Sequence, residues 1–369
     1  MNTEELARLR LEINALDDEL LTILQKRAFL SIQVAKAKQG GTIFYPAREK
    51  EIISRLQNKN KEKIEKNMVQ LPQESIAHIW TEIFSCSRML QKKTSLAFLG
   101  PLGTFSHYAG EELFGKSLTY QPCSDFNSIF AKVFSGEANL GLIPLENSLQ
   151  GTVGQCLDLF EIYPVSIIAE HYSSIHHCLL AKQTDFSKIK TIYSHPQALM
   201  QCHDWIQKNC PQAQVVELSS TAKGALRAME EEDSAAIGNE KLVQLSQEGK
   251  ILQVIAKDIA NCKDNTTRFA VIAKEKNSCS FVFPKSSFTF ALADKTGALS
   301  KVLQIIQQEN INLTKLESRP LYNKVQGTAW QYRFFADALA NLWEKPMLMQ
   351  ALKEHCYDIR ILGVYENLL

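Results

Sequence analysis

The first 39 residues constrain the fold of this chain most, because they contain neither glycine nor proline. Apolar residues recur there at alternating steps of three and four, which predicts one amphipathic helix from about Thr3 to Gly40-Gly41. At 1.5 Å per residue the helix is roughly 52 Å long. A module of about 90 residues cannot bury so long a stripe alone, so we expect it to pack against a second copy of the chain. The stripe comprises Leu6, Leu9, Ile13, Leu16, Leu20, Ile23, Leu30, Val34 and Ala37.

The stripe is interrupted where its spacing requires an apolar residue and the chain has Arg27. A guanidinium on a buried face needs an anion, since burying an unpaired charge is costly. A second helix is predicted from Pro46 and a third from about Pro72 to Lys92. Each polar residue on these helices is better explained alone as a surface ion pair, but together with Arg27 they predict a buried site for a dianion. These residues are Arg10, Lys38, Arg48, Glu49, Ser87 and Gln91.

Residues 1–93 resemble the all-helical chorismate mutases. The resemblance is carried by Leu9-Arg10-x-x-Ile13, Gln25-Lys26-Arg27, Lys36-Ala37-Lys38, Pro46-x-Arg48-Glu49 and Ser87-x-x-x-Gln91. It implies that two intertwined chains share each active site, with Arg10 crossing from one protomer. It further implies that Arg27 and Arg48 hold the carboxylates of chorismate. Lys38 and Gln91 would address the ether oxygen, and Glu49 and Ser87 would lie near the ring hydroxyl.

The chemistry of a chorismate mutase suits these side chains. The reaction is a pericyclic rearrangement, which requires a folded dianion held in a reactive shape and charge stabilisation on one oxygen. Cations and a neutral amide donor meet that requirement. Many relatives have glutamate at the position of Gln91, and a glutamate must be protonated to donate. Glutamine therefore predicts mutase activity that stays high into alkaline pH.

From Ser95 onward the pattern changes to short apolar runs that end in glycine turns or polar clusters. Repeated strand–turn–helix units predict parallel sheets with ligands bound at the strand ends. The glycine turn after Leu99, taken alone, is better explained as a plain turn than as an anion site. The pair His176-His177 has no partner at metal-ligand spacing, so we expect a structural role for it. The polar clusters are Thr104-Phe105-Ser106, Glu146-Asn147-Ser148, Ser194-His195-Pro196-Gln197 and Asn265-Thr266-Thr267-Arg268.

These clusters, in this order over about residues 95–273, resemble the prephenate dehydratases. The resemblance implies two α/β lobes around a cleft, similar to periplasmic binding proteins. Thr267 would be the central catalytic hydroxyl and Arg268 would hold a carboxylate. Prephenate loses carbon dioxide and its ring hydroxyl, so the enzyme needs chiefly a donor for the leaving hydroxyl. No metal or organic cofactor is expected. The remaining cleft residues would be Thr104, Ser106, Asn147, Ser148, Ser194 and Gln201.

The last part of the chain is predicted to have the order βαββαβ, which is ferredoxin-like. Gly297-Ala298-Leu299 and Glu317-Ser318-Arg319-Pro320 resemble the ACT regulatory domain of the same dehydratases, over about residues 284–369. The resemblance implies an L-phenylalanine site at a domain interface. Thr296 stands where a proline is common. The alternative is a purely structural domain with a tight helix start and a proline-terminated strand.

The bulk composition gives no reason to expect nucleic acid or a membrane as partner. The net charge is +1, and no stretch approaches the ~18–20 continuous apolar residues of a membrane span. Nine cysteines without a Cys-x-x-Cys pair predict reduced thiols in the cytoplasm.

The sequence therefore predicts a multidomain enzyme: an all-α module at 1–93, a two-lobed α/β module at 94–273 and an α+β module at 284–369. Its predicted function is conversion of chorismate to prephenate and of prephenate to phenylpyruvate, inhibited allosterically by L-phenylalanine. A homodimer or higher oligomer is expected. Two alternatives stay open: a phenylalanine-responsive binding protein that has lost the chemistry, and an enzyme that prefers arogenate.

Overall fold

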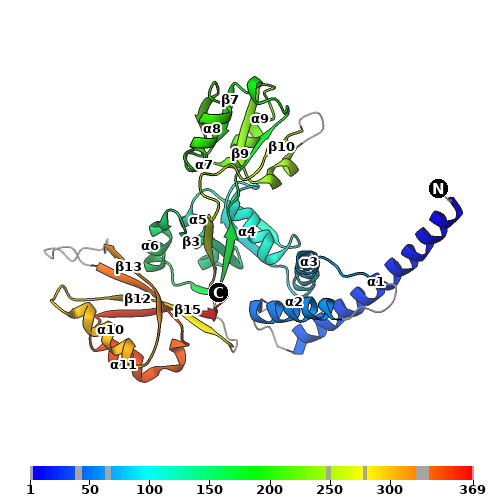
Figure 1. The fold of residues 1–369 in the computed structure, drawn as a ribbon. Coiled ribbons are helices and arrows are strands. Elements are labelled where there is room, and N and C mark those ends of the chain that lie inside the picture. Colours follow the sequence, from blue (N-terminus) through cyan, green and yellow to red (C-terminus); the bar gives the residue numbers. More distant parts are fainter. Residues whose placement is uncertain are drawn as a thin grey trace. The chain divides into compact units, whose positions relative to one another are not determined.

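A computed structural model of the 369-residue chain describes residues 3–37, 44–62, 68–246, 251–276, 281–320 and 332–367. The chain divides into two compact units, which Figure 1 shows as ribbons. The first unit contains residues 1–94 and 112–119, and the second contains residues 95–111 and 120–369. Over the described ranges, no helix is both long and apolar enough to cross a membrane.

The first unit is built from α1 (Thr3–Ala37), α2 (Pro46–Lys61) and α3 (Gln73–Gln91) (Figure 1). The predicted long helix is confirmed, since α1 runs without a break for 35 residues. Glu4 and Glu5 occupy its first turn, where the helix dipole favours negative charge. Pro46 opens α2, as expected for a residue that lacks the amide hydrogen. Both α1 and α2 contact α3.

The apolar stripe of α1 is uncovered within this chain. None of the residues Thr3–Ala37 is buried, and the side chains of Leu16 and Leu30 are 63% and 62% exposed. On α3, by contrast, Ile76 and Phe84 are buried. The helix thus exists in full, while the surface that its stripe should cover is not supplied by the chain itself.

The first lobe of the second unit contains a sheet with the order β2-β1-β3-β11-β5. Strands β1 and β3 are parallel, and β11 lies antiparallel between β3 and β5. The short strand β4 pairs antiparallel with the end of β3. The strands are β1 (Ser95–Leu99), β2 (Thr119–Cys123), β3 (Leu140–Asn147), β4 (Gly151–Thr152), β5 (Ser166–Ser174) and β11 (Thr266–Ala273), and the helices are α4 (Phe105–Phe114), α5 (Phe126–Ser135) and α6 (Gly154–Ile162).

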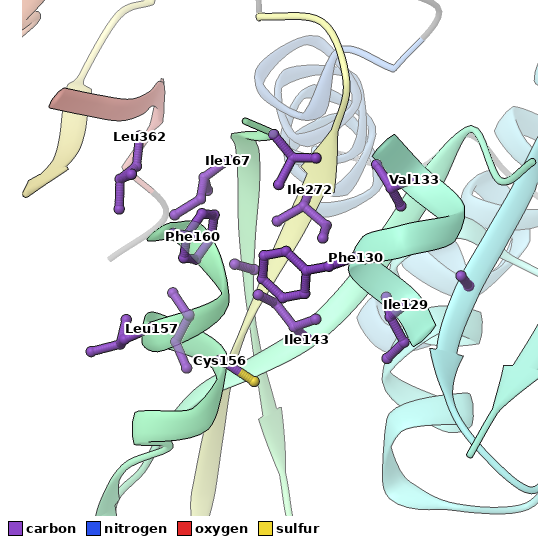
Figure 2. Packing of buried hydrophobic residues seen from close by; sticks show 14 of the residues in the cluster. Ile129, Phe130, Val133, Ile143, Cys156, Leu157, Phe160, Ile167, Ile272 and Leu362 are labelled. Atoms are coloured by element: carbon purple, nitrogen blue, oxygen red, sulfur yellow. The ribbon is translucent and has the colours of Figure 1, made fainter. Parts of the chain in front are cut away.

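The core of this lobe forms where α5 and α6 meet the sheet, as Figure 2 shows. The rings of Phe130 and Phe160 meet edge to face with centroids 5.1 Å apart. Ile143 and Ile272 contribute from β3 and β11. Leu362, which lies in the last strand of the chain, joins the same cluster. The C-terminal part of the chain therefore shares a hydrophobic core with the first lobe.

The second lobe contains a separate sheet with the order β10-β6-β9-β7-β8. Strand β7 pairs in parallel with β8 and β9, whereas β6 pairs antiparallel with β9 and β10. Two segments, residues 175–177 and 257–265, connect the lobes. The strands are β6 (Cys178–Ala181), β7 (Thr191–Ser194), β8 (Gln214–Glu217), β9 (Ser234–Gly238) and β10 (Gln253–Ala256), and the helices are α7 (Pro196–Gln201), α8 (His203–Asn209) and α9 (Thr221–Ala228).

The C-terminal module has the order βαββαβ that the sequence predicts, in one antiparallel sheet ordered β13-β14-β12-β15. Phe288 and Phe290 stack beneath the two helices with ring centroids 5.8 Å apart. The second helix begins at Pro346, after a 3₁₀ turn formed by residues 342–344. The elements are β12 (Pro284–Ala291), α10 (Ala298–Gln308), β13 (Leu313–Pro320), β14 (Tyr332–Ala338), α11 (Pro346–Lys353) and β15 (Asp358–Glu366).

Candidate active sites

In the helical unit, three of the predicted mutase residues lie together. Arg27 donates from Nη1 to Ser87 Oγ at 2.8 Å, and the charge of Glu49 acts on the same guanidinium. Burial lowers the pKa of Arg27, although Glu49 opposes that shift. Glu49 also forms an ion pair with Arg88. Burial raises the pKa of Glu49, although Arg88 acts to lower it. The unit therefore holds a half-buried cluster of both charge signs, with a serine hydroxyl.

The other predicted mutase residues do not join this cluster within one chain. Arg10 lies roughly 26 Å from Arg27 along α1 at 1.5 Å per residue. Arg48 is exposed and donates to Glu51 at 2.7 Å. Gln91 ends α3, one turn beyond Ser87. Lys38 falls outside the described residues.

In the second unit, a cavity of about 350 Å³ lies between the two lobes. This volume is within the usual range for a small-molecule site. Phe269 and Ile175 give it apolar walls. Among the described residues that line it there is no lysine, arginine, aspartate or glutamate. Five predicted substrate or catalytic residues line it: Thr104, Ser106, Asn147, Gln201 and Thr267.

The hydroxyl of Thr267 is held by Asn147, which lies opposite it in the β3–β11 register. Asn147 Oδ1 accepts hydrogen bonds from the backbone N–H groups of Leu149 and Gln150, at 3.1 and 3.2 Å. That fixes the orientation of the amide, so Asn147 Nδ2 donates to Thr267 Oγ1 at 3.0 Å. In this contact Thr267 Oγ1 is the acceptor, so its own hydroxyl hydrogen is not used and can be donated to a ligand.

Arg268 is a correction to the sequence prediction, because it does not line the cavity. Adjacent residues of a strand point to opposite faces, and Thr267 and Phe269 take the cavity face. Arg268 is 5% exposed and donates to Glu170 at 2.9 Å, to Asp337 at 2.6 Å and to Tyr365 Oη at 3.0 Å. Burial lowers the pKa of Arg268, but these three neighbours together raise it above its ordinary value. The expected contact with a substrate carboxylate is not met.

Two predicted cleft serines also serve the framework and are not among the residues lining the cavity. Ser194 is fully buried and donates to the carbonyl oxygen of Ile237 at 2.6 Å, which ties β7 to β9. Ser148 is exposed; its Oγ donates to the Asp264 carbonyl at 3.1 Å and accepts from Thr266 N at 3.0 Å. Both serines shape the chain around the cavity.

The predicted effector residues fall into two groups. Ala298 and Leu299 line a smaller cavity of about 150 Å³ in the C-terminal module, and Gly297, with φ +81°, caps the helix beside it. Glu317 and Arg319 lie on β13 and contact the first lobe instead. Glu317 accepts from Thr152 Oγ1 at 3.1 Å. Ser318 lies between them, opposite Phe334 in the sheet.

Arg319 closes a tight contact between the C-terminal module and the first lobe. It pairs with Asp158 through Nη2 at 2.7 Å and Nε at 3.1 Å. A Cβ added at Gly154, which opens α6, would come within 2.5 Å of the guanidinium. Glycine at that position therefore gives Arg319 room to reach α6.

Sequence reasoning missed two residues of the dehydratase site, His177 and Asn265. His176 is exposed and pairs with Asp258 at 2.9 Å, whereas His177 is buried and lines the cavity. Asn265 was recognised as part of a cluster, but its side-chain role was not. Both lie on the segments that connect the lobes, a position that follows only from the fold.

The fold and the cavity define a class: a protein in which a two-lobed α/β module that binds a small molecule is fused to a helical bundle and a βαββαβ module. The family model of prephenate dehydratase matches residues 96–277, and that of chorismate mutase type II matches residues 9–92. The chain belongs to the family of bifunctional chorismate mutase/prephenate dehydratases. It is an enzyme with both activities, which serve phenylalanine biosynthesis.

Individual relatives cover nearly the whole chain. The bifunctional chorismate mutase/prephenate dehydratase of Aquifex aeolicus is 38% identical over 99% of both chains. That of Escherichia coli K12 is 30% identical, over 98% of this chain and 96% of its own. Among solved structures, a prephenate dehydratase from Arthrobacter aurescens in complex with L-Phe superposes with a TM-score of 0.65 at 30% identity. It covers 74% of this chain and 90% of its own.

Proposed function

We propose that Thr267 is the catalytic hydroxyl of the dehydratase and that it donates a hydrogen bond to the departing ring hydroxyl of prephenate. The observation that carries this proposal is the orientation of Asn147, which donates to Thr267 Oγ1 at 3.0 Å. The hydroxyl hydrogen of Thr267 is thereby directed to a ligand. The hydrogen bond from Asn147 to Thr267 Oγ1 strengthens as the hydroxyl gives up its proton and negative charge develops on the oxygen. Loss of the carboxylate as carbon dioxide and departure of hydroxide then leave the aromatic ring of phenylpyruvate.

The carboxylates of prephenate are proposed to bind at helix N-termini rather than at Arg268. Among the helices that begin at the cavity are α4, through Thr104 and Ser106, and α9, through Ser220 and Thr221. Their first backbone N–H groups have no partner within the helix and carry partial positive charge, which favours anions. This arrangement supports binding of a dianion in a cavity where no described lining residue is a lysine or arginine.

The test of the Thr267 proposal compares Thr267→Val with Thr267→Ser. Valine keeps the shape and removes the hydroxyl, so phenylpyruvate formation from prephenate should fall about 10²–10³-fold in kcat, the usual cost of one transition-state donor. Serine should retain most of the activity. Mutase activity of the same preparations controls for folding. Undiminished phenylpyruvate formation by the valine variant would remove Thr267 from catalysis.

For the mutase, we propose a site completed by a second copy of the chain. The uncovered stripe of α1 and the half-buried cluster of Arg27, Glu49 and Ser87 support this proposal. Arg10 would reach the cluster from the partner, since within one chain it is too far along the helix. Arg27 and Arg48 would bind the carboxylates, and Lys38 and Gln91 the ether oxygen. The domain limits proposed for the three modules are 1–93, 94–273 and 284–369.

We further propose that the C-terminal module is an ACT domain through which L-phenylalanine inhibits the dehydratase. The cavity beside Gly297, Ala298 and Leu299 and the L-Phe complex of the Arthrobacter relative support this. Prephenate turnover by the full chain should slow as L-phenylalanine is added. The proposed setting is the cytoplasm, in keeping with free thiols at the described cysteines. Assays with arogenate beside prephenate would decide the substrate preference.

A further inference from the structure

We propose that His177 is a positioning residue of the dehydratase: by donating from Nε2 it holds Gln201, the first of three side-chain amides in a hydrogen-bonded chain that ends on the Thr267 hydroxyl. The inference rests on the proposed catalytic role of Thr267. His177 is 2% exposed and lies on the segment that leads from β5 to β6. It acts through other residues and is not assigned a step of the reaction.

The orientation of each amide in the chain follows from its neighbour. Asn147 accepts two backbone hydrogen bonds at Oδ1, so its Nδ2 must donate, and it does so to Asn265 Oδ1 at 2.7 Å as well as to Thr267. Asn265 therefore presents its Nδ2 to Gln201 Oε1, at 3.2 Å. Reversing any one of these amides would set two donors or two acceptors against each other.

The same logic fixes the tautomer of His177. Its Nε2 lies 2.8 Å from Gln201 Oε1, an oxygen that can only accept. Nε2 therefore carries the hydrogen, and Nδ1 carries the lone pair. Burial lowers the pKa of His177, against the effect of the Gln201 hydrogen bond, and keeps the ring neutral. The ring also meets Phe105 edge to face at 5.4 Å, which holds its plane.

The chain crosses the junction between the lobes. Gln201 ends α7 in the second lobe, whereas Asn147 and Thr267 lie on β3 and β11 in the first. Backbone hydrogen bonds tie the connecting segments together at the same place: Ile175 N donates to Asn265 O at 2.8 Å, and Ile259 N donates to His177 O at 3.0 Å. The chain therefore links Thr267 to the second lobe, which supplies part of the cavity wall.

The chain is not explained as a device for stability alone. Gln201 Nε2 and His177 Nδ1 are buried and have no hydrogen-bond partner among the described residues. Unpaired buried polar atoms destabilise a fold, so each one calls for an explanation other than stability. Both residues line the cavity. A network that kept Gln201 and His177 only for folding would be expected to satisfy these two atoms.

The test uses three substitutions at His177 in the full chain, assayed with prephenate. His177→Gln places an amide donor near the position of Nε2, His177→Asn reaches only the position of Nδ1, and His177→Phe keeps a ring without a donor. Phenylalanine and asparagine should lower kcat by roughly 10–100-fold with little change in KM, the size typical of residues that orient active-site groups. Glutamine should stay within about threefold of wild type, well inside that range. His176→Gln, at the exposed neighbour, should have no effect.

Three outcomes would overturn the inference. Full activity of His177→Phe would show that the donor is not needed. Activity retained by asparagine and lost in glutamine would assign the role to Nδ1. Equal losses in all three variants, with lowered Tm, would show a purely structural role. Thr267→Val in the same series separates the two proposals. If Thr267→Val stays active, the catalytic role of Thr267 is disproved. If Thr267→Val is inactive while His177→Phe is fully active, only the positioning role of His177 is disproved.

Discussion

Around Thr267, side chains 120 residues apart in sequence hydrogen-bond directly, whereas Arg10 and Arg27 lie on one helix and stay roughly 26 Å apart. The dehydratase site is thus assembled by one chain, with its amides oriented before a ligand arrives. The mutase cluster has an uncovered apolar stripe beside it. The difference teaches that a site contained in one chain can be followed atom by atom from its own hydrogen bonds. The mutase site, which we propose is completed by a partner, shows instead an apolar helix face that is not buried.

The strongest test of the self-contained unit is Arg268→Met. Asp337 would be left buried without a cation, while Glu170 would keep only Lys285, and breaking a buried pair on one side costs about 3–5 kcal/mol. Thermal unfolding should show a large fall in Tm for the second unit. Lys190→Met removes an exposed cation from Asp233 and serves as the matched control, which should leave Tm nearly unchanged because solvent screens an exposed ion pair.

A double-mutant cycle with Asp337→Asn refines this test. If Arg268 joins the catalytic strand β11 to the C-terminal module, the two substitutions should be strongly non-additive. Additive effects, or a Tm unchanged in Arg268→Met, would contradict the central role given to this pair.

The mutase cluster is tested by Arg27→Ala. Chorismate turnover should fall about 10²–10³-fold, because a positioned cation that stabilises developing charge is lost. Dehydratase activity with prephenate should stay unchanged, since the residues proposed for that reaction all lie in the second unit. Arg8→Ala is the control, as Arg8 is an exposed cation of the same helix paired with Glu12. Loss of both activities in folded Arg27→Ala protein would contradict the prediction that the two active sites are separate.

The partner-dependence of the mutase is tested by Leu16→Glu, which places a charge in the middle of the exposed stripe. The oligomer measured by light scattering should dissociate, and mutase activity should fall at least tenfold, since more than about 1.4 kcal/mol of association is lost with the leucine. Asn14→Glu adds the same charge at an exposed polar position of α1 and should leave both unchanged. An intact oligomer with normal mutase activity in Leu16→Glu would show that the stripe has another purpose.

Sequence reasoning succeeded where a pattern is local and failed where direction depends on the fold. The steps of three and four residues predicted α1, and the βαββαβ order followed from short runs of strand and helix. Arg268 was expected to hold a carboxylate, but the alternation along the strand sets it opposite Thr267, and which face meets the cavity depends on the sheet order. His177 was expected to have only a structural role, because its partner Gln201, and the Asn265 that donates to Gln201, come from other parts of the chain.

The smallest expected effect concerns Lys315, which lies on the strand that carries the predicted effector residues. Its Nζ donates to Glu146 Oε2 and to Thr152 Oγ1, both at 2.8 Å, and Glu146 immediately precedes the Asn147 that holds Thr267. Movement of β13 on binding L-phenylalanine would therefore pull on β3 beside the catalytic hydroxyl. Lys315→Met should raise the L-phenylalanine concentration for half-inhibition by about fivefold, the lower end of common allosteric couplings, with uninhibited turnover unchanged. Lys301→Met on α10, an exposed cation of the same module, is the control. If Lys315→Met is inhibited as strongly as wild type while binding L-phenylalanine normally, the coupling does not run through this contact, and the shared core around Leu362 becomes the place to test next.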